Sequence, residues 1–374
     1  MINNIDELKK NLAIVILAYS DYESLEISLA LHSKFLPYKT NDNERVKIFI
    51  LQNGRNTYDC ERTLEVAKRY RDLNPYDIEV VTNINPGIPY FSLSELFRSE
   101  RFKKFKYIIK LDDDVFPITP NWLDQLCQCF IDSKKKYNDN LAYVTSLVNN
   151  NPYGFGKILD LLKLREEFNS TYARDHIVGI KNLPQKYSPY RILNKGEIST
   201  GGAGTIWGCP YISRWIHKKT TLTPSSFAKA CANLGYSEVN NKERYSINCQ
   251  LFEKELWDKI YDGGSSDEFM WQKYCYHNNK KIIANLAVPM IHLFFFTQRF
   301  ENKDLLPKIR EVYTEYTSLP FPISLCSNKE LELERRLQFI EEKINKQNSS
   351  PLTRLKISIK KRLQKIKTKL KIKN

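Results

Sequence analysis

Three adjacent carboxylates, Asp112, Asp113 and Asp114, are the residues whose type and spacing point most directly to chemistry. They follow the short apolar run 107–111, whose β-branched residues are typical of a buried strand. Neighbouring carboxylates repel one another, so a fold that keeps them together supplies a cation or hydrogen-bond donors there. Hard oxygen ligands suit Mg²⁺ or Mn²⁺, and phosphate oxygens commonly complete the coordination of such a metal. An acidic turn before a helix near Asn121 would explain the same residues without a metal.

A second acidic pair, Asp267 and Glu268, stands at the start of a helix that the sequence predicts over 269–277. A carboxylate at a helix N-terminus is held as the anion by the helix dipole, so it can act as a general base. An ordinary N-cap and first helical turn contain the same residue types. The apolar run that follows carries His292, with Arg299 beyond it. A histidine in such a run is commonly a core residue, and an arginine commonly pairs with a surface acid.

Alternating strands and helices are predicted to position the three aspartates. The predicted strands are 13–19, 46–51, 78–82 and 107–111, with helices at 21–34, 60–71 and 92–102 between them. This alternation predicts an α/β fold with a mostly parallel sheet covered by helices. Ligands bind such sheets beyond the carboxyl ends of the strands, where Tyr19, Asn53 and Asn85 also lie. One crevice is therefore expected to collect these residues and the aspartates.

The middle of the chain is less regular. A strand over 141–147 and a helix over about 157–168 are predicted, whereas 170–195 carries no assignable pattern. The glycine-rich segment 201–204 can approach phosphate or sugar oxygens closely, with Trp207 stacking on a sugar ring. A surface loop beside a core tryptophan is the alternative. Strand 282–284 follows the predicted helix of the second acidic pair.

The overall charge of the 374-residue chain is +15, but the basic residues are not spread evenly. Residues 343–374 contain twelve Lys or Arg and no Asp or Glu, and without them the net charge falls to +3. The eight cysteines are scattered, with no paired C-x-x-C spacing, which indicates free thiols in a reducing compartment. The sequence carries no recognisable secretory signal, and the uncharged stretch 282–298 is too interrupted to span a membrane. A cytoplasmic location is expected.

The C-terminal segment predicts two amphipathic helices. The first covers 329–346, and after a break at 348–351 the second covers 352–373, with leucine and isoleucine at helical spacing and basic residues between them. A basic amphipathic helix can lie on an anionic membrane surface, which would place the protein on the inner membrane face. A coiled-coil seam or an RNA-binding arm are the alternatives. No nucleic acid is expected as a partner, because aromatic residues are not interleaved with the basic ones.

The second acidic pair, its helix, the polar turn Asn278-Asn279, the next strand and His292 follow an order that resembles the second half of family 2 GT-A glycosyltransferases. The first half agrees, because a strand, the Asn53-Gly54 turn and the aspartates followed by Trp122-Leu123 also stand in that family's order. The resemblance covers about 12–300. It implies a Rossmann-like GT-A catalytic domain over 1–325, with a nucleotide-sugar half at 12–148 and an acceptor half at 149–300. The helical extension with the basic tail occupies 326–374.

The resemblance also implies roles for the donor-side residues. Asp114 would bind the metal as part of the D-x-D signature, Asp112 would hold a metal water or the ribose, and His292 would be the third metal contact. Arg299 would reach the diphosphate. Asn53 stands where the family commonly has an aspartate that contacts the base, which leaves the base open. The nucleotide site would also include Tyr19, Asn85 and Asp113.

The family's catalytic acidic pair corresponds here to Asp267 and Glu268. Counting back from the Asn279 turn aligns Glu268 with the base, and Asp267 remains the alternative one residue away. One base and one displacement imply inversion at the anomeric carbon, although related GT-A folds also retain configuration.

The sequence thus predicts a transferase that uses Mn²⁺ or Mg²⁺ to move a sugar from a nucleoside-diphosphate donor to a lipid-linked or cell-surface glycan, such as a bacterial capsule or lipopolysaccharide. A nucleotidyltransferase is the enzymatic alternative, but it should carry a glycine-rich basic loop after strand 13–19, where residues 20–23 are acidic. The non-enzymatic alternative is a scaffold that binds membrane or nucleic acid through the basic tail.

Overall fold

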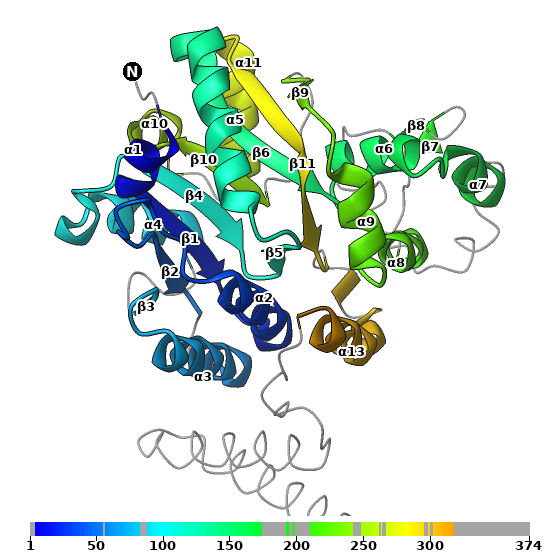
Figure 1. Ribbon diagram of the computed structural model, residues 1–374, viewed down its shortest axis with the longest axis horizontal. Coiled ribbons are helices and arrows are strands. Elements are labelled where there is room, and N and C mark those ends of the chain that lie inside the picture. Colours follow the sequence, from blue (N-terminus) through cyan, green and yellow to red (C-terminus); the bar gives the residue numbers. More distant parts are fainter. Residues whose placement is uncertain are drawn as a thin grey trace, which may run out of the picture. The chain divides into compact units, whose positions relative to one another are not determined.

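The computed structural model describes residues 4–54, 57–82, 88–173, 192–193, 197–198, 210–241, 248–261, 263, 267–294, 298–299 and 302–317 (Figure 1). Residues up to Leu319 form one compact unit. Several predicted features lie outside the described residues: Asn85, the glycine-rich segment 201–204 with Trp207, and both C-terminal amphipathic helices. Their predicted roles stay predictions.

The first part of the chain alternates strands and helices. After α1 (Ile5–Lys10) it forms β1 (Leu12–Ala18), α2 (Tyr22–Phe35), β2 (Lys47–Gln52), α3 (Tyr58–Leu73), β3 (Ile78–Val81), α4 (Pro89–Arg98), the 3₁₀ turn η1 (Glu100–Phe102) and β4 (Tyr107–Asp112). The strands pair in parallel in the order β3-β2-β1-β4. Asp21 caps α2 by accepting from the Ser24 amide at 3.2 Å, and Thr57 caps α3 through the Cys60 amide at 3.3 Å. The predicted parallel, helix-covered sheet is confirmed here.

The second part adds strands of both directions. Its elements are β5 (Val115–Pro117), α5 (Trp122–Tyr137), β6 (Leu141–Val148), α6 (Pro152–Leu161), α7 (Arg165–Phe168), β7 (Ile192–Leu193), β8 (Glu197–Ile198), α8 (Pro210–Lys219), α9 (Pro224–Cys231), β9 (Tyr236–Val239), β10 (Cys249–Glu253), α10 (Lys254–Ile260), α11 (Asp267–His277), β11 (Lys281–His292) and α13 (Leu306–Thr317). In the nine-stranded sheet of the described residues, β10 runs antiparallel between β4 and β6, and β11 pairs in parallel with β6. The short strands β5 and β9 pair antiparallel with β11.

Several elements of the structure were not predicted or have other bounds, and three of these differences have a clear physical reason. The single helix predicted over 157–168 is two helices, because Lys163 between them has a left-handed φ of 56°. The central strand β10 was not predicted, because its sequence, Cys-Gln-Leu-Phe-Glu, contains no β-branched residue and does not alternate strictly between apolar and polar residues. β11 extends past the predicted 282–284 to His292, and its pairing with β6 shifts between Asn285 and Pro289. This irregularity accommodates a proline, which cannot donate to the strand ladder.

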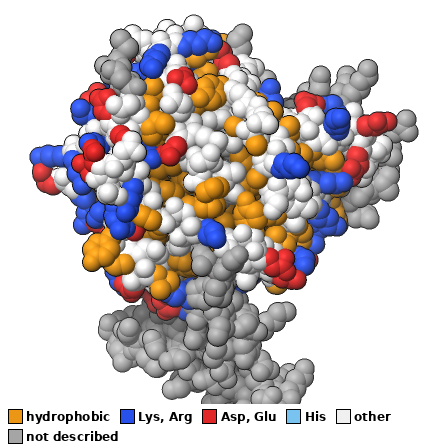
Figure 2. All heavy atoms as spheres, viewed as in Figure 1, with side chains coloured by type: hydrophobic (Ala, Val, Ile, Leu, Met, Phe, Trp, Pro, Cys, Tyr) orange, Lys and Arg blue, Asp and Glu red, His pale blue; other side chains and the backbone are white. Residues whose placement is uncertain are grey.

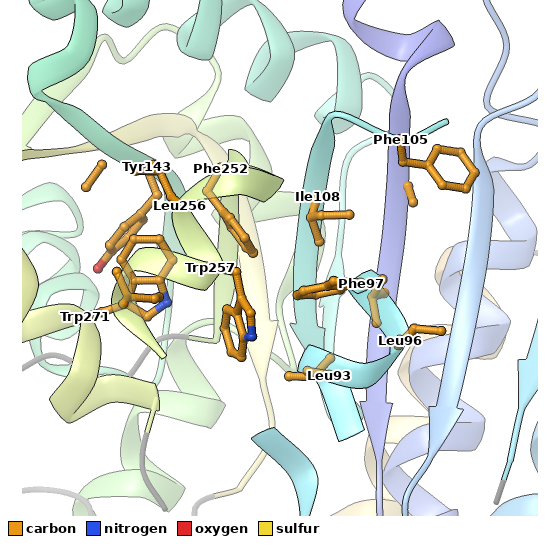
Figure 3. Packing of buried hydrophobic residues seen from close by; sticks show 14 of the residues in the cluster. Leu93, Leu96, Phe97, Phe105, Ile108, Tyr143, Phe252, Leu256, Trp257 and Trp271 are labelled. Atoms are coloured by element: carbon orange, nitrogen blue, oxygen red, sulfur yellow. The ribbon is translucent and has the colours of Figure 1, made fainter. Parts of the chain in front are cut away.

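Aromatic side chains fill the core between the sheet and helices α4, α10 and α11 (Figure 3). Phe97 of α4 meets the edge of Trp257 of α10, with ring centroids 5.4 Å apart and an interplanar angle of 86°. Trp271 of α11 packs similarly against Tyr143 of β6 at 5.0 Å. On the other side, α5 lies in front of β6 and β10 (Figure 1). Helices thus cover both faces of the sheet, as the apolar β1 sequence requires.

The surface of the described body has a mixed charge. On the face shown in Figure 2, Lys and Arg side chains gather toward the edges with acidic side chains among them, and hydrophobic ones are scattered over its middle. The six described cysteines are buried and unpaired: Cys60, Cys127, Cys129, Cys231, Cys249 and Cys275. None of the helices in the described part of the chain has the length and hydrophobicity of a membrane span.

Replacing Trp257 tests the importance of this aromatic core. Its side chain is 1% exposed, and its Nε1–H donates to Ser94 Oγ at 2.7 Å. Trp257→Ala should lower the free energy of unfolding by about 3–5 kcal/mol, measured as a shift of the urea midpoint at unchanged slope. The control Leu73→Ala, at a 64% exposed side chain, should change it by less than about 0.5 kcal/mol. Equal effects of the two substitutions would contradict the packing described.

Candidate active site

The pairing of β5 with β11 brings two predicted metal ligands together. His292, at the end of β11, lies opposite Val115, the first residue of β5, so Asp114 and Leu293 become neighbours. The Leu293 amide donates to the Asp114 carbonyl at 3.1 Å, and the Phe294 amide donates to Asp114 Oδ2 at the same distance. His292 Nε2 lies 3.4 Å from Asp114 Oδ2. Residues 178 positions apart in sequence thus share one edge of the sheet.

The hydrogen bond on the other ring nitrogen sets the tautomer of His292. Nδ1 lies 3.0 Å from the Asn150 carbonyl oxygen, which only accepts, so Nδ1 carries the proton. Burial lowers the pKa of His292 to about 4, so the ring is neutral near pH 7. A neutral ring with a protonated Nδ1 presents its Nε2 lone pair beside the Asp114 carboxylate. A backbone carbonyl that orients the second nitrogen is the usual support of a metal-binding histidine.

The Asp114–His292 pair fits a divalent cation as two ligands rather than as a complete cage. Nowhere in the described ranges do three or more His, Cys, Asp or Glu side chains come together as a metal site. Mg²⁺ and Mn²⁺ sites in nucleotide-using proteins commonly take one or two protein ligands and complete their shell with phosphate oxygens and water. Asp112, the other predicted ligand, instead bonds to Lys110 and Asn248 on the side of α11.

Arg299 is the cation that faces the aspartates. Its Nε forms a 2.8 Å ion pair with Asp21, and a terminal nitrogen lies 3.8 Å from Asp114 Oδ2. Burial raises the pKa of Asp114 and of Asp113, and the nearby guanidinium partly offsets this rise. Although burial disfavours its charge, these carboxylates raise the pKa of Arg299, which stays protonated. Arg299, predicted to reach the diphosphate, thus lies beside the aspartate predicted to bind the metal.

The predicted nucleotide residues at the ends of β1 and β2 have different surroundings. The Tyr19 amide donates to Asp113 Oδ2 at 3.2 Å, and its side chain is 42% exposed beside the aspartates. Asn53 is 1% exposed, and its side-chain amide donates to Ser92 Oγ of α4. Tyr19 is thus accessible to a ligand, whereas the Asn53 side chain joins β2 to α4 in this conformation.

The second acidic pair, Asp267 and Glu268, forms the start of α11 and lies near the same edge of the sheet. Asp267 is 2% exposed, and its Oδ2 accepts from Lys110 Nζ at 2.9 Å. Lys110 also donates to Asp112 Oδ1 at 2.7 Å, so one lysine links the two acidic motifs. Glu268 is partly exposed. Burial lowers the pKa of His292, and the negative charge of Glu268 acts in the opposite direction and raises it. The fold therefore brings the predicted base close to the predicted metal ligands.

A buried asparagine network supports His292, and the sequence interpretation missed it. Asn149 Oδ1 accepts from the His292 amide at 2.9 Å, while its Nδ2 donates to Thr220 and Thr221 of the segment after α8. Asn150 Nδ2 donates to the Leu293 carbonyl at 3.2 Å and to Gln298 at 2.8 Å. Three consecutive asparagines directly after an apolar strand were the available signal, since such residues end strands where polar groups converge.

Comparisons with known proteins identify distant structural neighbours. No protein-family model matches the chain, and no curated protein matches its sequence. GalNAc-T7, crystallised with UDP, GalNAc and Mn²⁺, aligns with 12% identity and a TM-score of 0.40 over 87% of this chain and 55% of its own. TarS of S. aureus aligns with 12% identity and a TM-score of 0.35 over 90% and 49%. Apo mouse xyloside xylosyltransferase 1 aligns with 11% identity and a TM-score of 0.28 over 80% and 83%.

The chain spans about half the length of the first two of these proteins. All three are distant, so the function proposed below rests on the residues of the site.

The role of Arg299 in neutralising the aspartates predicts a pH-dependent loss of stability. Without its charge, the pKa values of Asp113 and Asp114 in the folded state rise further above the value of about 3.9 expected in the unfolded chain. When the folded-state pKa of a carboxyl is raised, the free energy of unfolding falls as the pH rises from the unfolded-state pKa to the folded-state pKa, because the unfolded chain ionises first. Arg299→Met should therefore be less destabilising at pH 5 than at pH 8.

At pH 8, Arg299→Met should lower the free energy of unfolding by about 2–3 kcal/mol. Breaking a fully buried ion pair costs roughly 3–5 kcal/mol, and the effect is smaller here because 30% of the Arg299 side chain is exposed. Urea unfolding at the two pH values measures it. Arg214→Met, which breaks a more exposed pair with Asp304, should cost less than about 1 kcal/mol at both. A loss for Arg299→Met that is the same at pH 5 and pH 8 would contradict this role.

Proposed function

We propose that this protein is a metal-dependent glycosyltransferase that moves a sugar from a nucleoside-diphosphate donor onto a glycan or lipid-linked acceptor, with inversion at the anomeric carbon. One observation carries the proposal. Asp114 and His292 meet beside Arg299 at the carboxyl edge of the sheet, and Glu268 lies close by at the start of α11. A site for a metal–diphosphate group thus stands next to a candidate base.

The charge of the described residues supports a cationic ligand at this edge. Carboxylates outnumber cations there, since Lys110 and Arg299 face five aspartates: Asp21, Asp112, Asp113, Asp114 and Asp267. Asp114 and His292 would hold Mn²⁺ or Mg²⁺, which when bound neutralises the charge that develops on the leaving diphosphate. Arg299 would donate to a phosphate oxygen in exchange for part of its pairing with Asp21.

The nucleoside would lie toward β1 and β2. Tyr19 offers an exposed aromatic side chain for the base or ribose, and its backbone is fixed on Asp113. Asp112 accepts from Asn248 at 3.0 Å and is partly exposed, so it can also accept from a ribose hydroxyl or a metal-bound water. The buried Asn53 would have to leave Ser92 before it could reach a base.

Glu268 is the proposed base on the acceptor side, with Asp267 as the alternative. It lies in the first turn of α11 and is partly exposed, so an acceptor hydroxyl can approach its carboxylate. Glu268 would take the hydroxyl proton of the acceptor while that oxygen forms its bond to the anomeric carbon and the bond to the diphosphate oxygen breaks. A single displacement of this kind inverts the anomeric configuration.

The loop after β1 favours glycosyl over nucleotidyl transfer. In place of a basic, glycine-rich loop, this loop carries Asp21, which caps α2 through the Ser24 amide and pairs with Arg299. A carboxylate at this helix N-terminus competes with the phosphate group that a nucleotidyltransferase would bind there.

Nucleotide binding tests the donor side of the proposal. Isothermal titration with UDP, GDP and CMP, each with and without Mn²⁺, should give metal-dependent binding of one nucleotide to the wild type. Asp114→Asn should weaken that binding by at least roughly 10–100-fold, because even changes around a metal ligand have effects of this size.

Asp124→Asn is the matched control, since Asp124 is 53% exposed on α5 and pairs with Lys9. It should bind like the wild type. If the wild type binds no nucleotide under any metal condition, the proposed function is wrong.

Loss of the base tests the acceptor side. With the donor identified by titration, hydrolysis of the nucleotide sugar can be followed by NMR, with water as the acceptor. The first product should have the inverted anomeric configuration. Glu268→Gln should lower the turnover rate by roughly 10²–10⁴-fold, because it removes general-base catalysis. Glu255→Gln, an exposed first-turn residue of α10, should keep wild-type turnover, and a product that retains configuration would exclude the inverting mechanism.

A further inference from the structure

Lys110 is a buried lysine that joins the two acidic motifs of the chain. Its side chain is 2% exposed, and its ammonium group donates to Asp112 Oδ1 at 2.7 Å and to Asp267 Oδ2 at 2.9 Å. Lys110 and Asp112 are two residues apart on β4, so both side chains lie on the same face of the sheet. Asp267 reaches this lysine from the first turn of α11. A strand of the donor half is thereby tied to the helix that carries the proposed base.

The oxygens of Asp267 are already engaged by fixed donors. Oδ2 accepts from Lys110, Oδ1 accepts from the Glu268 amide at 2.8 Å, and the Tyr90 hydroxyl also hydrogen-bonds to this carboxylate. The Asp267 side chain is 3% exposed. To take a proton from an acceptor hydroxyl, it would have to lose donors and leave Lys110 with less compensation for its buried charge. Glu268, one residue on, is partly exposed.

We infer that Lys110 and Asp267 are positioning residues that fix the start of α11 against β4, so that Glu268 alone presents a base to the acceptor. This inference rests on the proposed function and deepens it. Lys110 stays charged, held by Asp112 and Asp267, and orients both carboxylates. Asp267 balances that charge and orients the Glu268 backbone, and neither residue exchanges a proton with the substrate.

A double-mutant cycle tests the ion pair without any substrate. Lys110→Met leaves Asp267 buried beside an apolar side chain and should lower the thermal unfolding midpoint by roughly 5–10 °C. In Lys110→Met/Asp267→Asn the buried charge is gone, and Asp112, which is 31% exposed, can be hydrated. The double variant should therefore be more stable than Lys110→Met alone. If the decreases in midpoint caused by Lys110→Met alone and by Asp267→Asn alone simply add in the double variant, the ion-pair assignment is overturned.

Lys9→Met is the matched control for removing a buried lysine. Lys9 is 8% exposed and pairs with Asp124 on α5. Lys9→Met should lower the midpoint and leave metal-dependent nucleotide affinity at the wild-type value. Lys110→Met should weaken that affinity by at least about tenfold, because Asp112 loses its orientation. Equal nucleotide affinities of the two variants would contradict a positioning role for Lys110.

Turnover separates a positioning role of Asp267 from a base. Asp267→Asn keeps an oxygen that accepts from Lys110, so it should bind nucleotide within about threefold of the wild type and lose at most roughly tenfold in kcat. Glu268→Gln should lose roughly 10²–10⁴-fold in kcat at similar nucleotide affinity. If Asp267→Asn loses as much turnover as Glu268→Gln, the inference is wrong and Asp267 is the base. If the wild type neither binds nor turns over a nucleotide sugar, the proposed function fails, and the cycle above still decides whether the ion pair exists.

Discussion

The concentration of carboxylates at the end of β4 is the constraint on which the rest of the site depends. Two of the three adjacent aspartates, Asp113 and Asp114, are buried, and burial together with repulsion between carboxylates raises their pKa values and disfavours their ionisation. The fold supplies compensation from two directions. Lys110 pairs with both Asp112 and Asp267 of α11, and Arg299, which follows β11 in the chain, lies near Asp114. The remaining negative charge favours a cation at this edge, which is the basis of the metal site proposed above.

Strand pairing explains how distant residues reach this edge. β4 ends at Asp112, and β5 begins three residues later and pairs with the end of β11. That antiparallel pairing sets Asp114 beside His292, while the parallel pairing of β11 with β6 sets Asn149 and Asn150 behind the histidine ring. The arrangement of Asp114 and His292 is therefore a consequence of strand register, since a shift by one residue would turn His292 away from Asp114.

Local patterns were sufficient to predict much of the fold. Apolar β-branched runs predicted the parallel strands β1 to β4, and the helices predicted from residues 21 and 60 begin at Tyr22 and Tyr58, where Asp21 and Thr57 cap them. The sequence also indicated Asp114, His292, Arg299 and Glu268 as one site, through their order along the chain. The structure brings these four residues near one another.

The pairings could not be predicted, because they depend on contacts between segments far apart. Nothing local distinguishes Lys110 from an exposed lysine, and its partner Asp267 lies 157 residues away. The same limit applies to β10, whose five residues separate β4 from β6 and create the mixed half of the sheet. Asp267 and Glu268 are alike by sequence, and only their surroundings separate them. One carboxylate is enclosed by a lysine, a tyrosine and a backbone amide, while its neighbour remains partly exposed. Burial and hydrogen bonding, rather than residue type, thus distinguish a structural carboxylate from one that can exchange a proton.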